Sequence, residues 1–151
     1  MRITTKVRYG LRALLEIATR SDGKPVPLST ISESQEISRK YLEQLVGSLR
    51  KAGLVVSRKG VQGGYYLARP PAEITLWDVL TSLEGQIPLV ECVPHPDLCS
   101  RSAFCATRSI WELLDTRLEE FWKGFTLQDL MDRLPEIESR LESGKAAPPS
   151  A

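Results

Sequence analysis

The sequence predicts a mainly α-helical fold that carries one small β-hairpin. Over most of the 151 residues, apolar side chains recur at spacings of three and four, which is the period of amphipathic helices. Between residues 54 and 68 this period gives way to two short β-branched and aromatic runs separated by glycines, a pattern typical of a hairpin. The chain is long enough to form one compact domain with an extension.

The first helix is predicted from a single apolar stripe. Its members are spaced by four, four, three and four residues and are Ile3, Val7, Leu11, Leu14 and Ala18. The helix should end at Ser21-Asp22-Gly23, because the two prolines that follow at positions 25 and 27 prevent its continuation.

Two short helices follow and together predict a helix-turn-helix. Ser29 is the expected N-cap of the first, which ends near Gln35, and Ser38 is the expected N-cap of the second. Gly53 suits the left-handed backbone position that often follows a helix. The second helix has a predicted buried side, formed by Tyr41, Leu42, Leu45, Val46 and Leu49.

The predicted hairpin completes a winged helix-turn-helix domain over residues 1–70. Its strands are expected at residues 54–57 and 65–68, and the tip between Arg58 and Gly64 is basic and glycine-rich. Pro70-Pro71 should close this domain.

Residues 71–143 are expected to hold a cysteine-bearing loop and the dimerisation helices. Thr75 should cap a helix that runs to Glu84 and ends at Gly85. A long helix follows the loop and carries an apolar seam, with Trp122 beside it, formed by Trp111, Leu114, Leu118, Phe121 and Phe125. So much aromatic surface on one helix suits a partner helix from a second subunit.

The last elements are short. Thr126 and Asp129 resemble a capping box that opens a short helix, and Pro135 should start a final polar helix. Residues 144–151 have the composition of a disordered tail.

Charge is distributed unevenly along the chain. Residues 1–69 contain 13 Lys and Arg against 5 Asp and Glu, a net of +8, whereas residues 70–151 contain 7 against 14, a net of −7. A basic half joined to an acidic half indicates that the first half binds a polyanion.

Several classes of protein are disfavoured. No stretch approaches the roughly 18 uninterrupted apolar residues of a membrane span, and charges interrupt the apolar pattern of the first twenty residues, so we expect a cytoplasmic protein without a membrane partner. The sequence has no P-loop, no nucleophile elbow and no paired histidines, which argues against an enzyme.

The first half is therefore expected to bind double-stranded DNA. The start of the second helix of the helix-turn-helix should meet the major groove, with candidate contacts from Ser38, Arg39, Lys40, Glu43 and Gln44. Arg58 and Lys59 at the wing tip suit the adjacent minor groove, and Arg8, Arg50 and Lys51 suit phosphates.

Several segments form a specific set. They read TTKVRYGLRALLEIA, ISRKYLEQLVGSLRKAGLV, GGYYLA, ITLWDVLTSLEG and FTLQDL, accompanied by the cysteine loop and Trp111. Together they resemble the IscR/NsrR/CymR family of bacterial transcription regulators. The resemblance implies a homodimer that exchanges contacts through its long helix and reads a pseudo-palindromic operator. One position departs, because iron–sulfur members often have arginine where this wing has Lys59.

Three cysteines lie in one loop at Cys92, Cys99 and Cys105, a C-x6-C-x5-C pattern. In a reducing compartment such a group argues against disulfides, and thiolates favour iron–sulfur clusters, zinc or copper(I). The close cysteine pairs that usually begin a structural zinc site are absent from the sequence. The resemblance implies that these cysteines hold a [2Fe–2S] or [4Fe–4S] cluster, through which the protein senses redox state, nitric oxide or iron–sulfur status.

A fourth ligand is not obvious. Some relatives have a histidine where this chain has Arg108, and others have an acidic residue in the first helix, where this chain has Arg8 and Arg12. An arginine has no lone pair to offer a metal. His95 is the candidate fourth ligand, Glu91 and Asp97 are weaker candidates, and an external ligand or an open iron position would suit sensing.

Two other functions share parts of this pattern. A cluster-free regulator of the same fold would sense through cysteine thiols, zinc or a protein partner. A protein-interaction module would have the same helices without salt-sensitive DNA binding. In the cluster hypothesis, loss or oxidation of the cluster reorganises the loop and changes the spacing of the two recognition helices.

Overall fold

A computed structural model describes residues 3–21 and 23–142, and within these the predicted mainly α-helical fold with one hairpin is confirmed. The helices and strands are α1 Thr5–Arg20, α2 Leu28–Gln35, α3 Arg39–Lys51, β1 Val55–Arg58, β2 Gly64–Leu67, α4 Leu76–Glu84, α5 Ala106–Lys123 and α6 Leu127–Glu142. Single 3₁₀ turns occur at Pro71–Glu73, Pro96–Leu98 and Ser102–Phe104. The predicted tail, residues 144–151, lies outside the described residues.

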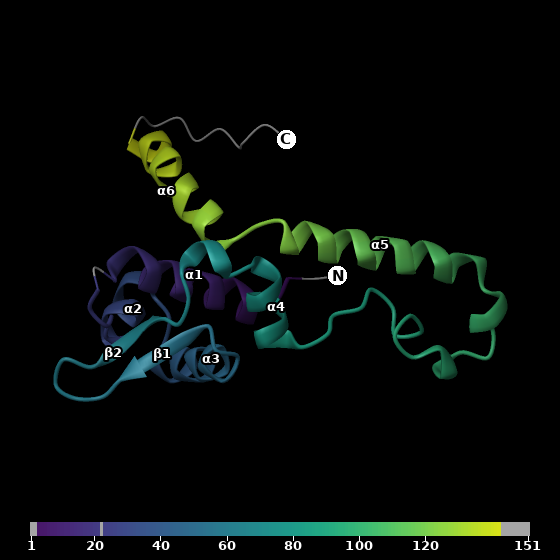
Figure 1. The fold of residues 1–151 in the computed structure, drawn as a ribbon, viewed down its shortest axis with the longest axis horizontal. Coiled ribbons are helices and arrows are strands. Elements are labelled where there is room, and N and C mark those ends of the chain that lie inside the picture. Colours follow the sequence, from purple (N-terminus) through teal and green to yellow (C-terminus); the bar gives the residue numbers. More distant parts are fainter. Residues whose placement is uncertain (1–2, 22, 143–151) are drawn as a thin grey trace.

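The hydrophobic core lies where α1 packs against α2, α3, α4 and the hairpin. Val7 and Leu14 of the predicted stripe are fully buried, and its other members, Ile3, Leu11 and Ala18, are half-buried against the core. Ile17, which was not part of the predicted stripe, is also fully buried. A Cβ added at Gly10 would lie 2.3 Å from Cδ1 of the buried Leu83, so the Leu83 side chain of α4 packs directly on the α1 backbone at this glycine. Figure 1 shows these elements gathered into one body from which α5 projects.

The caps of α3 and α4 are those predicted. Ser38 accepts a hydrogen bond from the Tyr41 backbone N–H, and Gly53 after α3 has φ +70°. Thr75 and Asp78 form a reciprocal capping box at the start of α4.

The predicted cap of α2 is wrong. The helix begins one residue earlier, at Leu28, with Pro27 in the cap position and no side-chain hydrogen bond there. The preceding Val26 is paired with Tyr65 of β2 through two backbone hydrogen bonds of 2.7 and 2.9 Å. This pairing fixes the direction in which the chain enters α2, and Ser29 therefore lies in the first turn.

The hairpin is antiparallel, with Val55 opposite Leu67 and Arg58 opposite Gly64. Both strands are displaced by one residue from their expected positions. At Gly64 an added Cβ would lie 2.5 Å from the carbonyl carbon and oxygen of Val26, so the backbone of the Val26 segment occupies the space that a side chain would need.

The first residues of α4 and α6 are connected by two reciprocal backbone hydrogen bonds with the residues that precede the other helix. The Leu76 N–H donates to the Phe125 carbonyl, and the Leu127 N–H donates to the Ile74 carbonyl, both at 2.8 Å. The predicted capping box of Thr126 and Asp129 is present.

The final helix differs from the prediction, because Pro135 lies inside α6 rather than at the start of another helix. A proline removes one backbone hydrogen bond of a helix, and this helix continues beyond it.

Candidate DNA-binding face and cysteine loop

Helix α3 is held against the body by its apolar side. Leu42, Leu45, Val46 and Leu49 are buried as predicted, and Tyr41 packs edge-on against Tyr9 of α1 with ring centroids 6.1 Å apart. The opposite side of α3 faces outward. All of the predicted DNA-contacting side chains are exposed, namely Ser38, Arg39, Lys40, Glu43, Gln44, Arg50, Lys51, Arg58, Lys59 and Arg8.

The structure brings half of these residues around one hollow of about 520 Å³ between α2, α3 and the hairpin. They are Arg39, Glu43, Arg50, Arg58 and Lys59. Two local contacts order this set: Arg39 Nε lies 3.5 Å from Glu43 Oε1, and Arg50 Nη1 donates to Ser57 Oγ at 3.5 Å. With four cations and one carboxylate, the hollow has a net positive charge and suits an anionic ligand.

The first turn of α2 also borders this hollow, through Pro27, Leu28 and Ser29. Because no side chain caps α2, the backbone N–H groups of its first turn lack the usual internal partner. Sequence reasoning missed this feature because it assigned the Ser29 hydroxyl to the cap.

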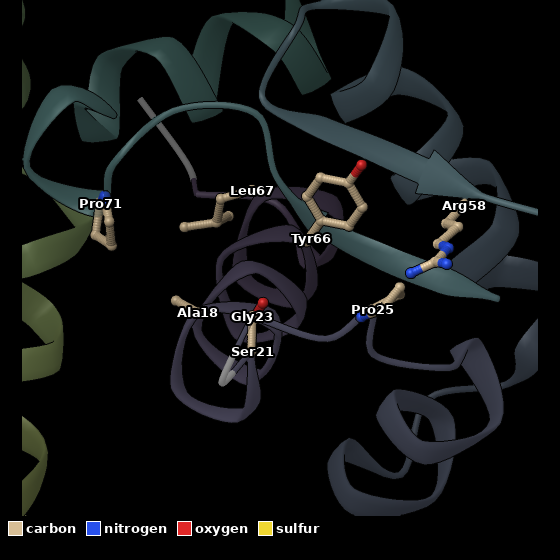
Figure 2. A pocket seen from close by; sticks show the side chains of 8 residues that line it. All are labelled: Ala18, Ser21, Gly23, Pro25, Arg58, Tyr66, Leu67 and Pro71. Atoms are coloured by element: carbon tan, nitrogen blue, oxygen red, sulfur yellow. The ribbon is translucent and has the colours of Figure 1, made fainter. Parts of the chain in front are cut away.

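Arg58 also borders a second hollow, of about 440 Å³, between the hairpin and the end of α1. Figure 2 shows its guanidinium reaching toward Pro25, with Tyr66, Leu67 and Ser21 around the same space. A contact between Arg58 and a DNA minor groove therefore requires this long side chain to swing away from Pro25.

A polar network ties the turn before α3 to α1. Gln35 Nε2 donates to Glu16 Oε2 at 2.7 Å, and Arg12 Nε donates to Gln35 Oε1 at 3.0 Å. Burial alone would raise the pKa of Glu16, but hydrogen bonds from Ser34, Arg20 and Gln35 outweigh it, so the pKa lies below its ordinary value. Glu36, which follows Gln35 at the end of α2, has a left-handed backbone with φ +53°. No sequence pattern predicts this network, because its hydrogen-bonded partners lie 19 and 23 residues apart in the chain.

Helix α5 presents an apolar surface to solvent. None of its residues is buried, and its exposed large apolar side chains are Ile110, Trp111, Leu113, Leu114 and Phe121. Leu118 and Trp122 lie toward α4, where they line a hollow with Trp77. The predicted seam therefore divides into an outward and an inward part. Phe125 lies beyond the helix and packs on Phe121 with ring centroids 5.0 Å apart.

The cysteine loop connects α4 to the far end of α5 (Figure 1). Cys92, Cys99 and Cys105 are free thiols, each partly exposed. Over the described residues, no three cysteine, histidine, aspartate or glutamate side chains lie close enough together to hold one metal ion. His95, Glu91 and Asp97 are exposed, and none of them forms such a group with the cysteines.

The donor chemistry of the loop nevertheless suits a soft metal centre. Cys105 precedes α5, and a contact of 3.1 Å between its Sγ and Thr107 Oγ1, followed by the backbone N–H of Arg108, lowers its pKa. A lowered pKa favours the thiolate, which is the form that binds metals. Three accessible thiols in a loop with only two single 3₁₀ turns therefore fit an iron–sulfur group by donor type.

Arg108 is engaged with the loop rather than free. Its Nε donates to the Cys92 carbonyl at 3.0 Å, and its Nη2 donates to the Val93 carbonyl at 3.2 Å. Nη2 also lies 2.8 Å from Glu112 Oε1, one turn along α5. The sequence indicates only that Arg108 cannot bind a metal, and no sequence pattern predicts these contacts with the loop.

Comparison with known proteins identifies the family. The profile of the Rrf2 family, described as an iron-dependent transcriptional regulator, matches residues 3–133. The chain belongs to the Rrf2 family. The match extends from α1 through the wing and the cysteine loop into α6, and it confirms the resemblance seen in the sequence.

Similar proteins with known names support the same family assignment. The chain is 43% identical over 131 residues to protein rrf2 of Nitratidesulfovibrio vulgaris, which covers 87% of each chain. It is 38% identical over 148 residues to the transcriptional regulator IscR of Vibrio parahaemolyticus, which covers 97% of this chain and 88% of that protein.

Solved structures of similar proteins have the same fold as this chain. The chain is similar to CymR, the global cysteine regulator of B. subtilis, with a TM-score of 0.73 and 37% identity over 87% of this chain and 97% of that one. It is also similar to T. potens IscR, with a TM-score of 0.70 and 38% identity over 87% of each chain. None of the described helices is both long and apolar enough to cross a membrane.

Proposed function

We propose that this Rrf2-family regulator binds DNA as a homodimer and senses redox, nitric oxide or iron–sulfur status through a cluster on Cys92, Cys99 and Cys105. The observation that carries the DNA-binding part is the hollow between α3 and the hairpin, where Arg39, Arg50, Arg58 and Lys59 gather. The net positive charge of this hollow suits a DNA phosphate backbone that enters between the recognition helix and the wing.

The exposed side of α3 meets the major groove in this proposal. Arg39, Lys40, Glu43 and Gln44 face the base edges, and Ser38 caps the helix that presents them. Arg8, Arg50 and Lys51 contact phosphates, together with the uncapped first turn of α2. Lys59, with Arg58 after its side chain has turned, enters the minor groove.

The outward side of α5 pairs with the same surface of a second copy. Ile110, Leu113, Leu114 and Phe121 recur at three-, four- and seven-residue spacings and share one face of the helix. Large apolar side chains gathered on one surface are costly to leave in water, and a second α5 would bury them. This pairing sets the distance between two recognition helices that read half-sites about one DNA turn apart (~34 Å).

The three cysteines would hold the cluster, and the family description as iron-dependent supports that assignment. When bound, the cluster supplies an iron centre that reacts with oxidants and nitric oxide. The chain's own contribution is the loop that links α4 of the DNA-binding body to α5 of the dimer. A change in this loop shifts the population between two spacings of the recognition helices.

Purification without oxygen tests the cluster. We expect visible absorption with iron and acid-labile sulfide, and bleaching in Cys99→Ala. A chain that stays colourless after reconstitution with iron and sulfide contradicts the cluster and favours thiol or zinc sensing.

Fluorescence anisotropy with a labelled operator tests the DNA-binding face separately. Arg39→Ala should weaken binding by about fivefold to 150-fold, since a single contact of this kind is worth about 1–3 kcal/mol. Arg133→Ala is the control, because Arg133 lies on α6, outside the predicted DNA-binding residues, and stacks on Phe125. Equal losses in both variants would contradict the assignment of the face.

A further inference from the structure

We infer that Arg108 is a positioning residue of the cysteine loop, whose guanidinium clamps the Cys92 segment onto the first turn of α5 beside Cys105. The geometric part stands on contacts in this chain alone. The consequence for iron rests on the proposed function, because it concerns a cluster held by these cysteines.

The contacts form a fork. Nε and Nη2 of Arg108 donate to two consecutive carbonyls, those of Cys92 and Val93, while Glu112 binds Nη2 from the next turn. A planar guanidinium can bind two neighbouring acceptors at once, whereas a lysine ammonium is a single point charge on a flexible stem. The Arg108 side chain is only 23% exposed, so the loop also covers it from solvent.

A second contact holds the same stretch of loop two turns further along α5. Asp115 Oδ1 accepts a hydrogen bond from the Leu89 N–H at 3.0 Å. Residues seven apart lie on one face of a helix, so Arg108 and Asp115 hold residues 89–93 along a single face of α5.

The position of Arg108 in α5 also indicates that its contacts with the loop carbonyls and Glu112 stabilise it there. It is the third residue of α5, a helix with no acidic residue in its first turn and no side-chain cap. A cation in the first turn opposes the helix dipole, so an arginine is unfavourable there unless specific acceptors offset the cost. The loop carbonyls and Glu112 are those acceptors.

The clamp divides the cysteine loop into two parts. The Cys92 carbonyl is bound by Arg108, and Cys105 directly precedes α5, so both cysteines are fixed at the start of this helix. The hydrogen bonds described for residues 96–104 stay within the segment 95–104, as in Ser102 N–H to the Cys99 carbonyl at 3.0 Å. The backbone beside Cys92 and Cys105 is therefore anchored at the start of α5, whereas none of the described hydrogen bonds ties the Cys99 segment to α5.

The test compares Arg108→Gln, which loses the charge and the fork, with Arg108→Lys, which keeps the charge and loses the fork. Arg133→Gln is the control. In full-length, reduced, iron-free protein, amide hydrogen exchange is measured by mass spectrometry for peptides that cover residues 86–95. Both Arg108 variants should exchange at least about fivefold faster there than wild type, because local opening becomes easier when charge-assisted hydrogen bonds are lost.

The same variants are then reconstituted with iron and sulfide, and the rate of iron loss to a chelator is measured. Both Arg108 variants should lose iron faster than wild type and Arg133→Gln. Unchanged exchange in Arg108→Gln overturns the clamp, and wild-type behaviour of Arg108→Lys overturns the fork.

Faster exchange with unchanged iron loss overturns the positioning role. If wild type itself takes up no iron or sulfide, the proposed cluster fails, and the exchange result alone still decides the clamp.

Discussion

Replacing Gly64 with alanine should destabilise the protein, although the same change usually stabilises a strand. Alanine has less backbone freedom to lose than glycine and gains about 0.5–1 kcal/mol in a strand interior on that account. At Gly64, however, the new Cβ would lie 2.5 Å from the carbonyl carbon and oxygen of Val26 and 2.9 Å from the nitrogen of Pro27. These are backbone atoms, which cannot rotate out of the way.

The size of the effect follows from what must move. Forcing a methyl group into a filled space costs about 1–3 kcal/mol. Pushing the Val26 segment away also weakens the two backbone hydrogen bonds between Val26 and Tyr65, each worth about 1 kcal/mol net. After the alanine gain is subtracted, we expect a net loss of about 2 kcal/mol or more, which lowers the thermal midpoint by roughly 4–8 °C.

Gly47→Ala is the matched control. Gly47 lies inside α3, and an added Cβ there meets no atom within 4 Å, so alanine should raise stability by up to about 1 kcal/mol. Urea unfolding followed by circular dichroism at one fixed protein concentration measures both variants, since any self-association makes stability depend on concentration. If Gly64→Ala is as stable as wild type, the reasoning is refuted, because the backbone of the Val26 segment then leaves room for a side chain at Gly64.

Three further changes test other contacts. Glu16→Gln should lower the free energy of unfolding at pH 7, measured by urea titration. Because the folded pKa of Glu16 is depressed, the difference in unfolding free energy between this variant and wild type should shrink as pH falls below 4.5. A difference that stays constant with pH would contradict the network around Glu16. Thr75→Ala should cost about 1 kcal/mol through loss of the capping box, whereas Ser29→Ala, which removes no cap, should cost less in the same assay. Leu114→Glu should convert the proposed dimer to monomer in light scattering without loss of helicity, and an unchanged mass would refute the α5 interface.

The elements that sequence reasoning predicted correctly are those with local causes. The caps at Ser38, Thr75 and Thr126 each depend on residues three positions apart, and the apolar stripe of α1 depends on helical period alone. The exposed side of α3 follows from the same period, because fixing the buried side also fixes the outward one. For this reason the residues that α3 contributes to the basic hollow between α2, α3 and the hairpin could be predicted from the sequence.

The features that escaped prediction depend on contacts between distant segments. Ser29 was assigned to a cap because nothing in the sequence shows that Val26 pairs with Tyr65, 39 residues away, and that this pairing starts α2 early. Arg108 was considered only for what it cannot bind, since its carbonyl partners lie 15 and 16 residues earlier in an irregular loop. Such contacts carry no periodic signal, and they are concentrated where the wing and the cysteine loop are positioned.

The contacts of α1 indicate how a change in the cysteine loop would reach DNA. The loop starts at the end of α4, and that end is fixed to α1: Lys6 Nζ donates to the Leu83 carbonyl, and Thr4 Oγ1 donates to Glu84 Oε1 at 2.5 Å. The other side of α1 carries α3 through the Tyr9 and Tyr41 rings. Because packed cores move as units rather than bending continuously, a strain in the loop should shift α4, α1 and α3 together. The recognition helix would then keep its own geometry and change its position relative to α5, which in the proposed dimer alters the spacing of two half-sites rather than the reading of either one.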